Sequence, residues 1–419
     1  MKRRSRISRL FGPGLITGAA DDDPSGIATY SQAGAAYGLG QLWTVILCLP
    51  LMIAVQEACA RIGSATSQGL VKVTARLYSK GVLFFVVALV VMANVINIGA
   101  NFAAVGAALN LLLPLPIPLL STLFMVIVLA LEIFIGYHAY ARFLKFLALS
   151  LLSYVAVALI VTDNWGTVIK ATFVPEFEWN SAYWYVIVAI LGTTISPYMF
   201  FWQTAEEVEE SNYSLSKKKS KRPIGEIRRD TAVGMGISQF GSWFMIITAA
   251  VVLHENGVTN IGTAADAARA LEPLVEGFPH AGTIAKVLFA IGIVGMGLLG
   301  IPVLAGSVAY AMSDAFNWRE GLDYKLKEAK QFYGVIIFAT VAGWLITLVG
   351  IDPIKSLVFA AVINGLVAVP LIFLIGRISR NREVMGELTG KGLSRATLNL
   401  AFIVMLLCAL MLVGTAIFA

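Results

Sequence analysis

Apolar residues along this chain gather into long blocks that are separated by short polar segments. Each block approaches the roughly 20 consecutive apolar residues that a helix needs to cross a bilayer. We therefore predict an all-α polytopic membrane protein with eleven transmembrane helices. The blocks cover residues 10–39, 42–62, 82–112, 117–136, 143–162, 182–211, 231–255, 283–315, 331–350, 354–377 and 396–418.

The polar segments between the blocks predict short helices and loops. Residues Ser67–Ser79 read as a short helix at the membrane interface, and Lys217–Arg222 reads as a solvated basic loop. The long connection Glu255–Pro279 is polar, with a short helix expected at Ala264–Leu271. None of these segments is long enough to form a separate extramembrane domain.

Composition supports a bilayer environment for this chain. Soluble domains carry about 25% charged residues, whereas this chain carries 13% and is 58% hydrophobic. Too few polar side chains remain to cover a soluble surface, so we expect lipid to be a partner of the chain. Location in the plasma membrane follows as an expectation.

The net charge of +6 indicates topology and not nucleic-acid binding. Cytoplasmic loops of membrane proteins carry an excess of lysine and arginine. If the N-terminus is cytoplasmic and the C-terminus lies outside, all but four of the 31 basic residues fall inside. The exceptions are Lys170, Arg269, Lys286 and Lys355.

The first and sixth blocks are both interrupted near the middle by proline and small polar residues. The interruptions are Ala20–Gly26 and Gly192–Pro197. Proline removes a backbone donor and disfavours helix at the preceding residue. Broken helices at matching positions of two halves indicate the binding site of a transporter built from inverted repeats. We predict one transport domain over 1–419, with repeats at 10–162 and 182–377 and an extra helix at 396–418.

The first interruption carries three consecutive carboxylates: Asp21, Asp22 and Asp23. A charged residue at the centre of a membrane helix costs about 2.5–3.5 kcal/mol. Either the run caps a helix at the membrane boundary, or it binds a cation within the bilayer. Apolar sequence continues on both sides, which favours the cation and Asp23 as its anchor. Asp21 and Asp22 are candidates for the ion path.

Carboxylate, carbonyl and hydroxyl oxygens are the ligands available at both interruptions, and hard cations such as Mg²⁺, Ca²⁺ and Mn²⁺ prefer these donors. Beyond the second interruption, Ser196, Gln203 and Glu207 fall near one helix face. Glu207 belongs to an acidic group at the end of this helix, with Glu206, Glu209 and Glu210. This group is either a solvated turn or an acidic vestibule that concentrates cations.

Three asparagines share one face of the third block: Asn94, Asn97 and Asn101. Asparagine in a membrane helix often joins neighbouring helices by hydrogen bonds. The alternative is that Asn97 and Asn101 line the ion path, and both interpretations stay open here.

Two regions resemble one family of membrane proteins. The stretch from Gly12-Pro13-Gly14 through Asp23-Pro24-Ser25-Gly26 to Glu57–Gly63 resembles the opening of the NRAMP family of divalent metal transporters. The interruption Gly192–Pro197 resembles the sixth helix of that family. The resemblance implies the LeuT-like fold of two inverted five-helix repeats. It also implies that Asp23 and the carbonyls of Ala20 and Thr193 contact the metal.

The chain departs from the family pattern at informative positions. The family motif D-P-G-N is Asp23-Pro24-Ser25-Gly26 here, so Gly26 replaces an asparagine ligand. The motif M-P-H is Ser196-Pro197-Tyr198, so a hydroxyl replaces the thioether and Tyr198 replaces the histidine tied to proton movement. Asn101 aligns with an acidic residue that the family uses for protons. The pattern resembles the NRAMP-related magnesium transporters.

These features predict a transporter of Mg²⁺, and also Mn²⁺, that works by alternating access without proton coupling. A proton-coupled Mn²⁺ or Fe²⁺ importer is the second hypothesis, and a carrier of a trivalent metal or organic solute on the same fold is the third. We expect a monomer that is not an enzyme, binds no cofactor besides the transported metal and binds no nucleic acid.

Overall fold

The computed structural model describes residues 17–418, except for 19, 20, 22, 135–151, 217–222 and 323. Within these ranges all regular elements are helices, and nine spans are long and apolar enough to cross a membrane. The spans are α3 (Trp43–Thr66), α5 (Lys80–Asn110), α6 (Ile117–Phe134), the pair α10 (Ser181–Thr194) and α11 (Pro197–Ser216), α12 (Ile224–Ala249) with the π-turn η3 (Ala250–His254), α14 (Ala281–Phe316), α15 (Lys330–Thr347), α16 (Pro353–Ile378) and α18 (Gly392–Phe418).

Two further helices account for parts of the remaining predicted blocks. Helix α2 (Pro24–Tyr37) is the second half of the first block, and α8 (Leu152–Val161) is the end of the fifth. Residues 10–16, 19, 20 and 22 of the first block and 143–151 of the fifth lie outside the described residues. The all-helical prediction is therefore confirmed wherever the structure describes the chain.

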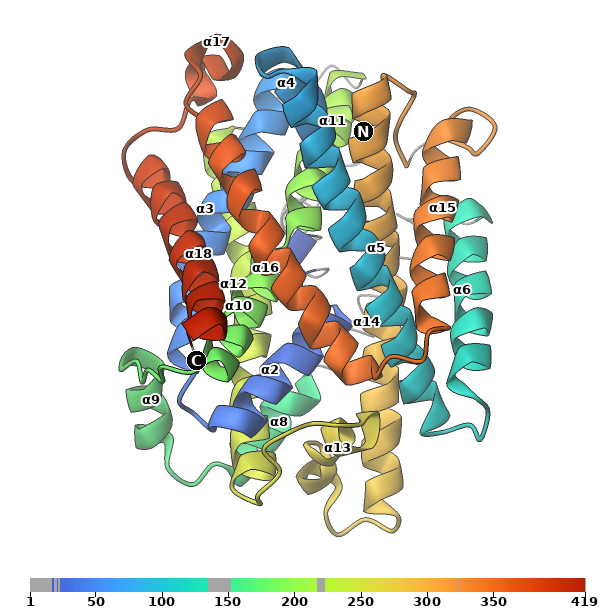
Figure 1. Cartoon of the computed structure of the whole chain (residues 1–419), viewed down its shortest axis with the longest axis vertical. Coiled ribbons are helices and arrows are strands. Elements are labelled where there is room, and N and C mark those ends of the chain that lie inside the picture. Colours follow the sequence, from blue (N-terminus) through green and yellow to red (C-terminus); the bar gives the residue numbers. More distant parts are fainter. Residues whose placement is uncertain are drawn as a thin grey trace, which may run out of the picture.

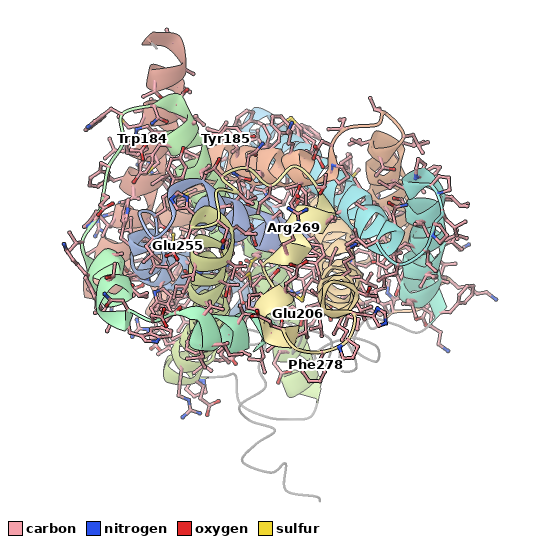
Figure 2. All side chains as sticks on the ribbon, turned by 90° about the horizontal axis from the view of Figure 1, so that it is seen from below. Trp184, Tyr185, Glu206, Glu255, Arg269 and Phe278 are labelled. Atoms are coloured by element: carbon pink, nitrogen blue, oxygen red, sulfur yellow. The ribbon has the colours of Figure 1, made fainter. Side chains whose placement is uncertain are left out.

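Short helices lie at the two ends of the bundle. Figure 1 shows α4 (Leu70–Leu77) and α17 (Arg382–Met385) at one end, and α9 (Trp165–Phe173) and α13 (Ala264–Arg269) at the other. Figure 2 looks onto the second end, where Glu255, Arg269 and Phe278 mark the connection between α12 and α14. The alternation of inside and outside segments predicts this division.

Two short helices and one helix start differ from the prediction. Helices α9 and α17 were not predicted, because each is short and lies between two apolar blocks. Helix α12 begins at Ile224 instead of 231, because its first polar turns continue the helix beyond the apolar block. The helices α4 and α13 lie where short helices were predicted.

The break in the sixth span is present but narrower than the predicted Gly192–Pro197. Helix α10 ends at Thr194 and α11 begins at Pro197, so two residues separate the half-helices. In the first span the prediction was too wide, because Ser25 and Gly26 already belong to the first turn of α2. Proline at the first helical position explains this start, since its missing N–H has no partner in a first turn anyway.

The half-helices lie deep in the bundle, and α2 and α11 occupy opposite halves of its height (Figure 1). A Cβ atom on Gly192 would collide with the backbone of Ala361 and Gly365, so α10 approaches α16 through this glycine. Small residues allow such close backbone contact between membrane helices. The break that follows α10 is thereby held inside the bundle beside α16.

Candidate cation site

Asp23 stands at the start of α2 and is buried, with 1% of its surface exposed. Its Oδ1 atom caps the helix by accepting hydrogen bonds from the backbone N–H groups of Ser25 (3.0 Å) and Gly26 (3.3 Å). The Ser25 hydroxyl donates to the same oxygen at 2.5 Å. The positive end of the helix dipole also favours negative charge here. The local sequence Asp-Pro-Ser-Gly therefore holds the carboxylate in place.

The second carboxylate oxygen of Asp23 faces α5. Asn101 donates its Nδ2 to Oδ2 at 3.0 Å, and Asn97 does so at 3.5 Å. All these donors are neutral, and no cationic side chain among the described residues pairs with Asp23. A buried carboxylate held only by neutral dipoles is a strong electrostatic site for a cation.

Of the three asparagines of α5, one joins neighbouring helices and two contact the candidate site. Asn94 donates to the carbonyl of Leu304 in α14 at 3.0 Å, so it joins two helices. Asn97 and Asn101 contact Asp23 instead. Their Oδ1 atoms are buried without a partner in the described part of the chain, which leaves two more oxygen donors beside Asp23.

Two hydroxyl contacts join the half-helices. The Ser25 Oγ lies 3.0 Å from Thr193 Oγ1, and the Tyr30 hydroxyl lies 2.8 Å from Thr194 Oγ1. Ser25 therefore contacts both Asp23 and the end of α10. The sequence reading quoted Ser25 only as part of a motif and missed this bridging position.

Thr193 and Ser196 flank the break between α10 and α11, and both are buried. The Ser196 hydroxyl donates to the carbonyls of Gly192 (2.7 Å) and Thr193 (2.8 Å). Its proton thus points into the last turn of α10, and its lone pairs stay available as an oxygen ligand. The Thr193 carbonyl predicted to bind metal therefore already accepts one hydrogen bond.

Of the other two acidic residues of the first interruption, Asp21 is buried at 2% exposure and accepts a hydrogen bond from Ser238 of α12 at 2.6 Å. Ser238 is a site neighbour that sequence reasoning missed, because a single serine in a glycine-rich span gives no distinct signal. The predicted residues Ala20 and Asp22 lie outside the described residues.

Glycines shape the space beside Asp23. A Cβ on Gly300 of α14 would lie 3.0 Å from the Asp23 Cβ, so a glycine allows α14 to approach this residue. A Cβ on Gly26 would meet the Tyr30 ring at 3.4 Å and Thr193 Oγ1 at 3.6 Å, which is ordinary contact. Position 26 therefore has room for a Cβ atom.

The predicted path along α11 is buried throughout. Tyr198, Gln203 and Glu207 are exposed by 1%, 0% and 1%. Both amide atoms of Gln203 are without a partner among the described residues, and the same is true of Gln56 on α3. Leaving a buried polar atom unpaired costs about 1–3 kcal/mol. These amides are buried polar groups on α11 and α3, and Gln56 was missed by the sequence reading.

At the acidic end of α11, two of the four glutamates are buried, and the other two, Glu209 and Glu210, are half-buried. Glu206 and Glu207 are exposed by only 4% and 1%. Gly63 of α3 explains the burial of Glu207, because its missing side chain lets α11 pack against it through Thr204 and Glu207. The two glutamates therefore lie within the protein on the second half of α11.

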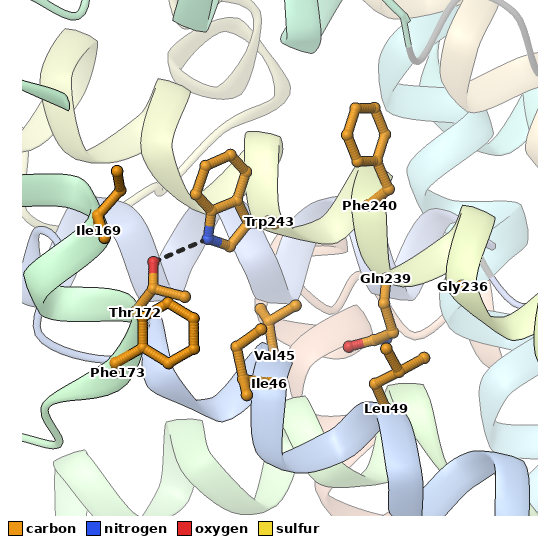
Figure 3. A pocket seen from close by; sticks show the side chains of 10 residues that line it. All are labelled: Val45, Ile46, Leu49, Ile169, Thr172, Phe173, Gly236, Gln239, Phe240 and Trp243. Carbon is orange, nitrogen blue, oxygen red and sulfur yellow. Dashed lines mark hydrogen bonds between the residues drawn. The ribbon is translucent and has the colours of Figure 1, made fainter.

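A separate cavity of about 330 Å³ lies between α3, α9 and α12. Figure 3 shows its lining, which is apolar apart from Gln239 and the hydrogen bond from Trp243 Nε1 to Thr172 Oγ1 at 3.0 Å. It contains no carboxylate and does not include Asp23. We therefore assign the cation chemistry to the helix breaks and not to this cavity.

Relatives share the whole length of the chain. A divalent metal cation transporter MntH from Klebsiella pneumoniae is 26% identical over 400 residues, covering 93% of this chain and 89% of the relative. One of the same name from Pectobacterium carotovorum is 27% identical over 408 residues, covering 94% and 91%.

Solved structures share the fold. The Eremococcus coleocola manganese transporter, in complex with an aromatic bis-isothiourea substituted compound, superposes with a TM-score of 0.72 at 17% identity, covering 99% of this chain and 88% of that one. MhsT in complex with L-phenylalanine gives 0.66 at 13% identity, covering 97% and 99%. The LeuT-like architecture predicted from the two breaks is thereby confirmed.

The model of the family described as natural resistance-associated macrophage protein-like matches residues 14–415. This match includes both helix breaks and almost the entire chain. The chain belongs to the Nramp family.

Proposed function

We propose that this protein carries divalent cations across a membrane, with Mg²⁺ as the main substrate and Mn²⁺ as a second one. Transport proceeds by alternating access around the breaks of the first and sixth spans, and it moves no protons. The protein acts as a monomer in the plasma membrane, with its N-terminus in the cytoplasm and its C-terminus outside.

The observation that carries this proposal is the environment of Asp23. Its carboxylate is buried at the junction of the broken helices and is held by neutral donors from α2 and α5. A negative charge at this depth needs a positive counterpart. The relatives named as divalent metal cation transporters support a metal ion in that role.

The donor chemistry supports magnesium. Ser196 offers oxygen where a soft thioether would select transition metals. No group of three or more histidine, cysteine, aspartate or glutamate residues is placed to hold a metal within the described ranges. A site with few protein ligands suits an ion that keeps several of its waters, as Mg²⁺ does.

The proposed lack of proton coupling rests on Asn101. The amide at this position donates a hydrogen bond to Asp23 at 3.0 Å and carries no titratable proton. Tyr198, which replaces the family's histidine, is fully buried, and its backbone carbonyl accepts a hydrogen bond from Ser307 at 2.9 Å. Neither side chain exchanges a proton near neutral pH.

Two matched variants test the site. Asp23 and Asp352 both cap helices, at the start of α2 and α16. Asparagine also caps helices well, so Asp23→Asn and Asp352→Asn both keep the cap and remove one charge. In proteoliposomes holding a magnesium-sensitive dye, we expect Asp23→Asn to abolish uptake and Asp352→Asn to preserve it. Normal uptake by Asp23→Asn would refute the assigned site.

A proton-coupled manganese importer is the second candidate, because the structural neighbour from Eremococcus coleocola is a manganese transporter. A pH-sensitive dye in parallel liposomes separates the two. Manganese entry with internal acidification and without magnesium entry would establish the second candidate. An organic solute is disfavoured, because Asp23 would repel the carboxylate that such sites bind.

A further inference from the structure

Glu209 joins the inner end of α11 to α14 and to the loop that follows α14. Its Oε1 atom accepts a hydrogen bond from the Tyr310 hydroxyl at 2.5 Å and from the Leu322 backbone N–H at 3.0 Å. Tyr310 lies on α14 and is buried at 4% exposure. One carboxylate oxygen thus holds two segments that are distant from α11 in sequence.

The same loop is fixed on its other side by Asp314, the last buried residue of α14. The Asp314 carboxylate accepts hydrogen bonds from the backbone N–H groups of Val71 and Lys72 in the first turn of α4. A Cβ on Gly69 would collide with this carboxylate, so the contact requires glycine. Glu320, in the loop, shares a hydrogen bond with Asp314.

Carboxyl groups dominate the charges around Glu320. Burial raises the pKa of Glu320 to about 9, and the Asp314 carboxylate adds to this effect. Lys72 from α4 is the cation that opposes it, and Glu209 adds negative charge from α11. Within the loop itself, the Arg319 guanidinium lies 4.1 Å from the centre of the Tyr324 ring. At neutral pH, Glu320 therefore carries a proton that it donates to Asp314.

We propose that Glu209, Tyr310 and Leu322, supported by the Asp314–Glu320 pair, form an inner clasp that closes the cytoplasmic side and opens when the pair loses its shared proton. The proposal rests on the alternating-access function above, since α11 is the half-helix that begins at the break in the sixth span. Without the proton, Asp314 and Glu320 repel each other, and the loop that holds Glu209 is released.

Opening of the clasp is measured with Cys59 as a reporter. Cys59 is buried on α3, and its carbonyl accepts a hydrogen bond from Thr204 of α11 at 3.3 Å. With Cys48 and Cys408 replaced by alanine, a membrane-impermeant thiol reagent added to the cytoplasmic side reports access to this interface. The readout requires no transported ion.

The first comparison removes one hydroxyl. Tyr310→Phe deletes a hydrogen bond to a carboxylate, and we expect Cys59 to be labelled about tenfold faster. Tyr333→Phe is the matched control, because the Tyr333 hydroxyl donates to the carbonyl of Tyr324 at 2.8 Å and does not contact Glu209. Equal labelling of Tyr310→Phe and the unmodified reporter protein would overturn the clasp.

The second comparison tests the proton. Glu320→Gln keeps a neutral hydrogen-bond donor toward Asp314 at every pH. The intrinsic reactivity of the Cys59 thiol changes with pH equally in the reporter protein and in this variant, so the ratio of their labelling rates removes that effect. The ratio of reporter to Glu320→Gln labelling should be near one at pH 7 and rise several-fold above pH 9. A ratio that stays constant would overturn the proton-dependent part. If the protein takes up no magnesium but both labelling contrasts are observed, the clasp is supported and magnesium is refuted as the substrate.

Discussion

Replacing Asn101 by aspartate is expected to make transport pH-dependent. Asn101 Nδ2 lies 3.0 Å from Asp23 Oδ2, so Asn101→Asp places a second carboxylate at hydrogen-bond distance. At an effective dielectric constant of about 20, two charges about 3 Å apart repel by about 5.5 kcal/mol. The lost charged hydrogen bond adds about 1.5–3 kcal/mol. Protonating an ordinary aspartate at pH 7 costs only about 4 kcal/mol, so the two carboxylates should share one proton.

A cation must displace that proton in order to bind. Initial magnesium uptake at low substrate concentration should therefore fall by up to about tenfold for each unit of decreasing pH between 8 and 6. The unmodified protein should show a flat profile. Asn94→Asp is the control, because Asn94 lies on the same helix but donates to Leu304 and not to Asp23. A flat profile for Asn101→Asp would refute the reasoning.

Three other predictions follow from separate contacts. Gly26→Asn should fold, because a Cβ there makes ordinary contact with Thr193 Oγ1 at 3.6 Å, and should shift competition assays from magnesium toward manganese. Arg61→Ala should lower the free energy of unfolding by about 3 kcal/mol, because it removes charged hydrogen bonds to the Leu388 carbonyl at 2.9 Å and to Ser394 at 3.0 Å. Thermal unfolding in detergent measures this loss, and an unchanged midpoint would contradict it. Because the pKa of Glu320 rises from 4.5 to about 9 on folding, its contribution to stability is complete below pH 4.5 and is lost as the pH rises through about 9. Unfolding midpoints should therefore fall as the pH rises from about 4.5 to about 9 in the unmodified protein, and this fall should be smaller in Glu320→Gln.

Hydrophobic blocks and prolines predicted most of the fold. The blocks match the described spans, because a bilayer demands long apolar helices whatever their tertiary contacts. The break at Pro197 was also predictable from the missing donor of proline. The start of α12 at Ile224 was not, because a polar amphipathic turn outside the membrane has no hydropathy signal.

The candidate site was predicted less completely than the fold. Asp23 was identified because a carboxylate within an apolar block is rare and costly. Ser238 and Gln56 were missed, since their positions depend on how α12 and α3 pack against the breaks. The burial of Glu207 was undecided in sequence, because the contact with Gly63 joins residues far apart in the chain.

The reversal potential of magnesium flux in proteoliposomes tests the central claim most directly. An uncoupled carrier of Mg²⁺ moves two charges for each ion, so its reversal potential should change by about 30 mV for each tenfold magnesium gradient. It should not change when a pH gradient is imposed at a fixed magnesium gradient. A reversal potential that moves with the pH gradient would contradict the account, because protons would then travel with the metal.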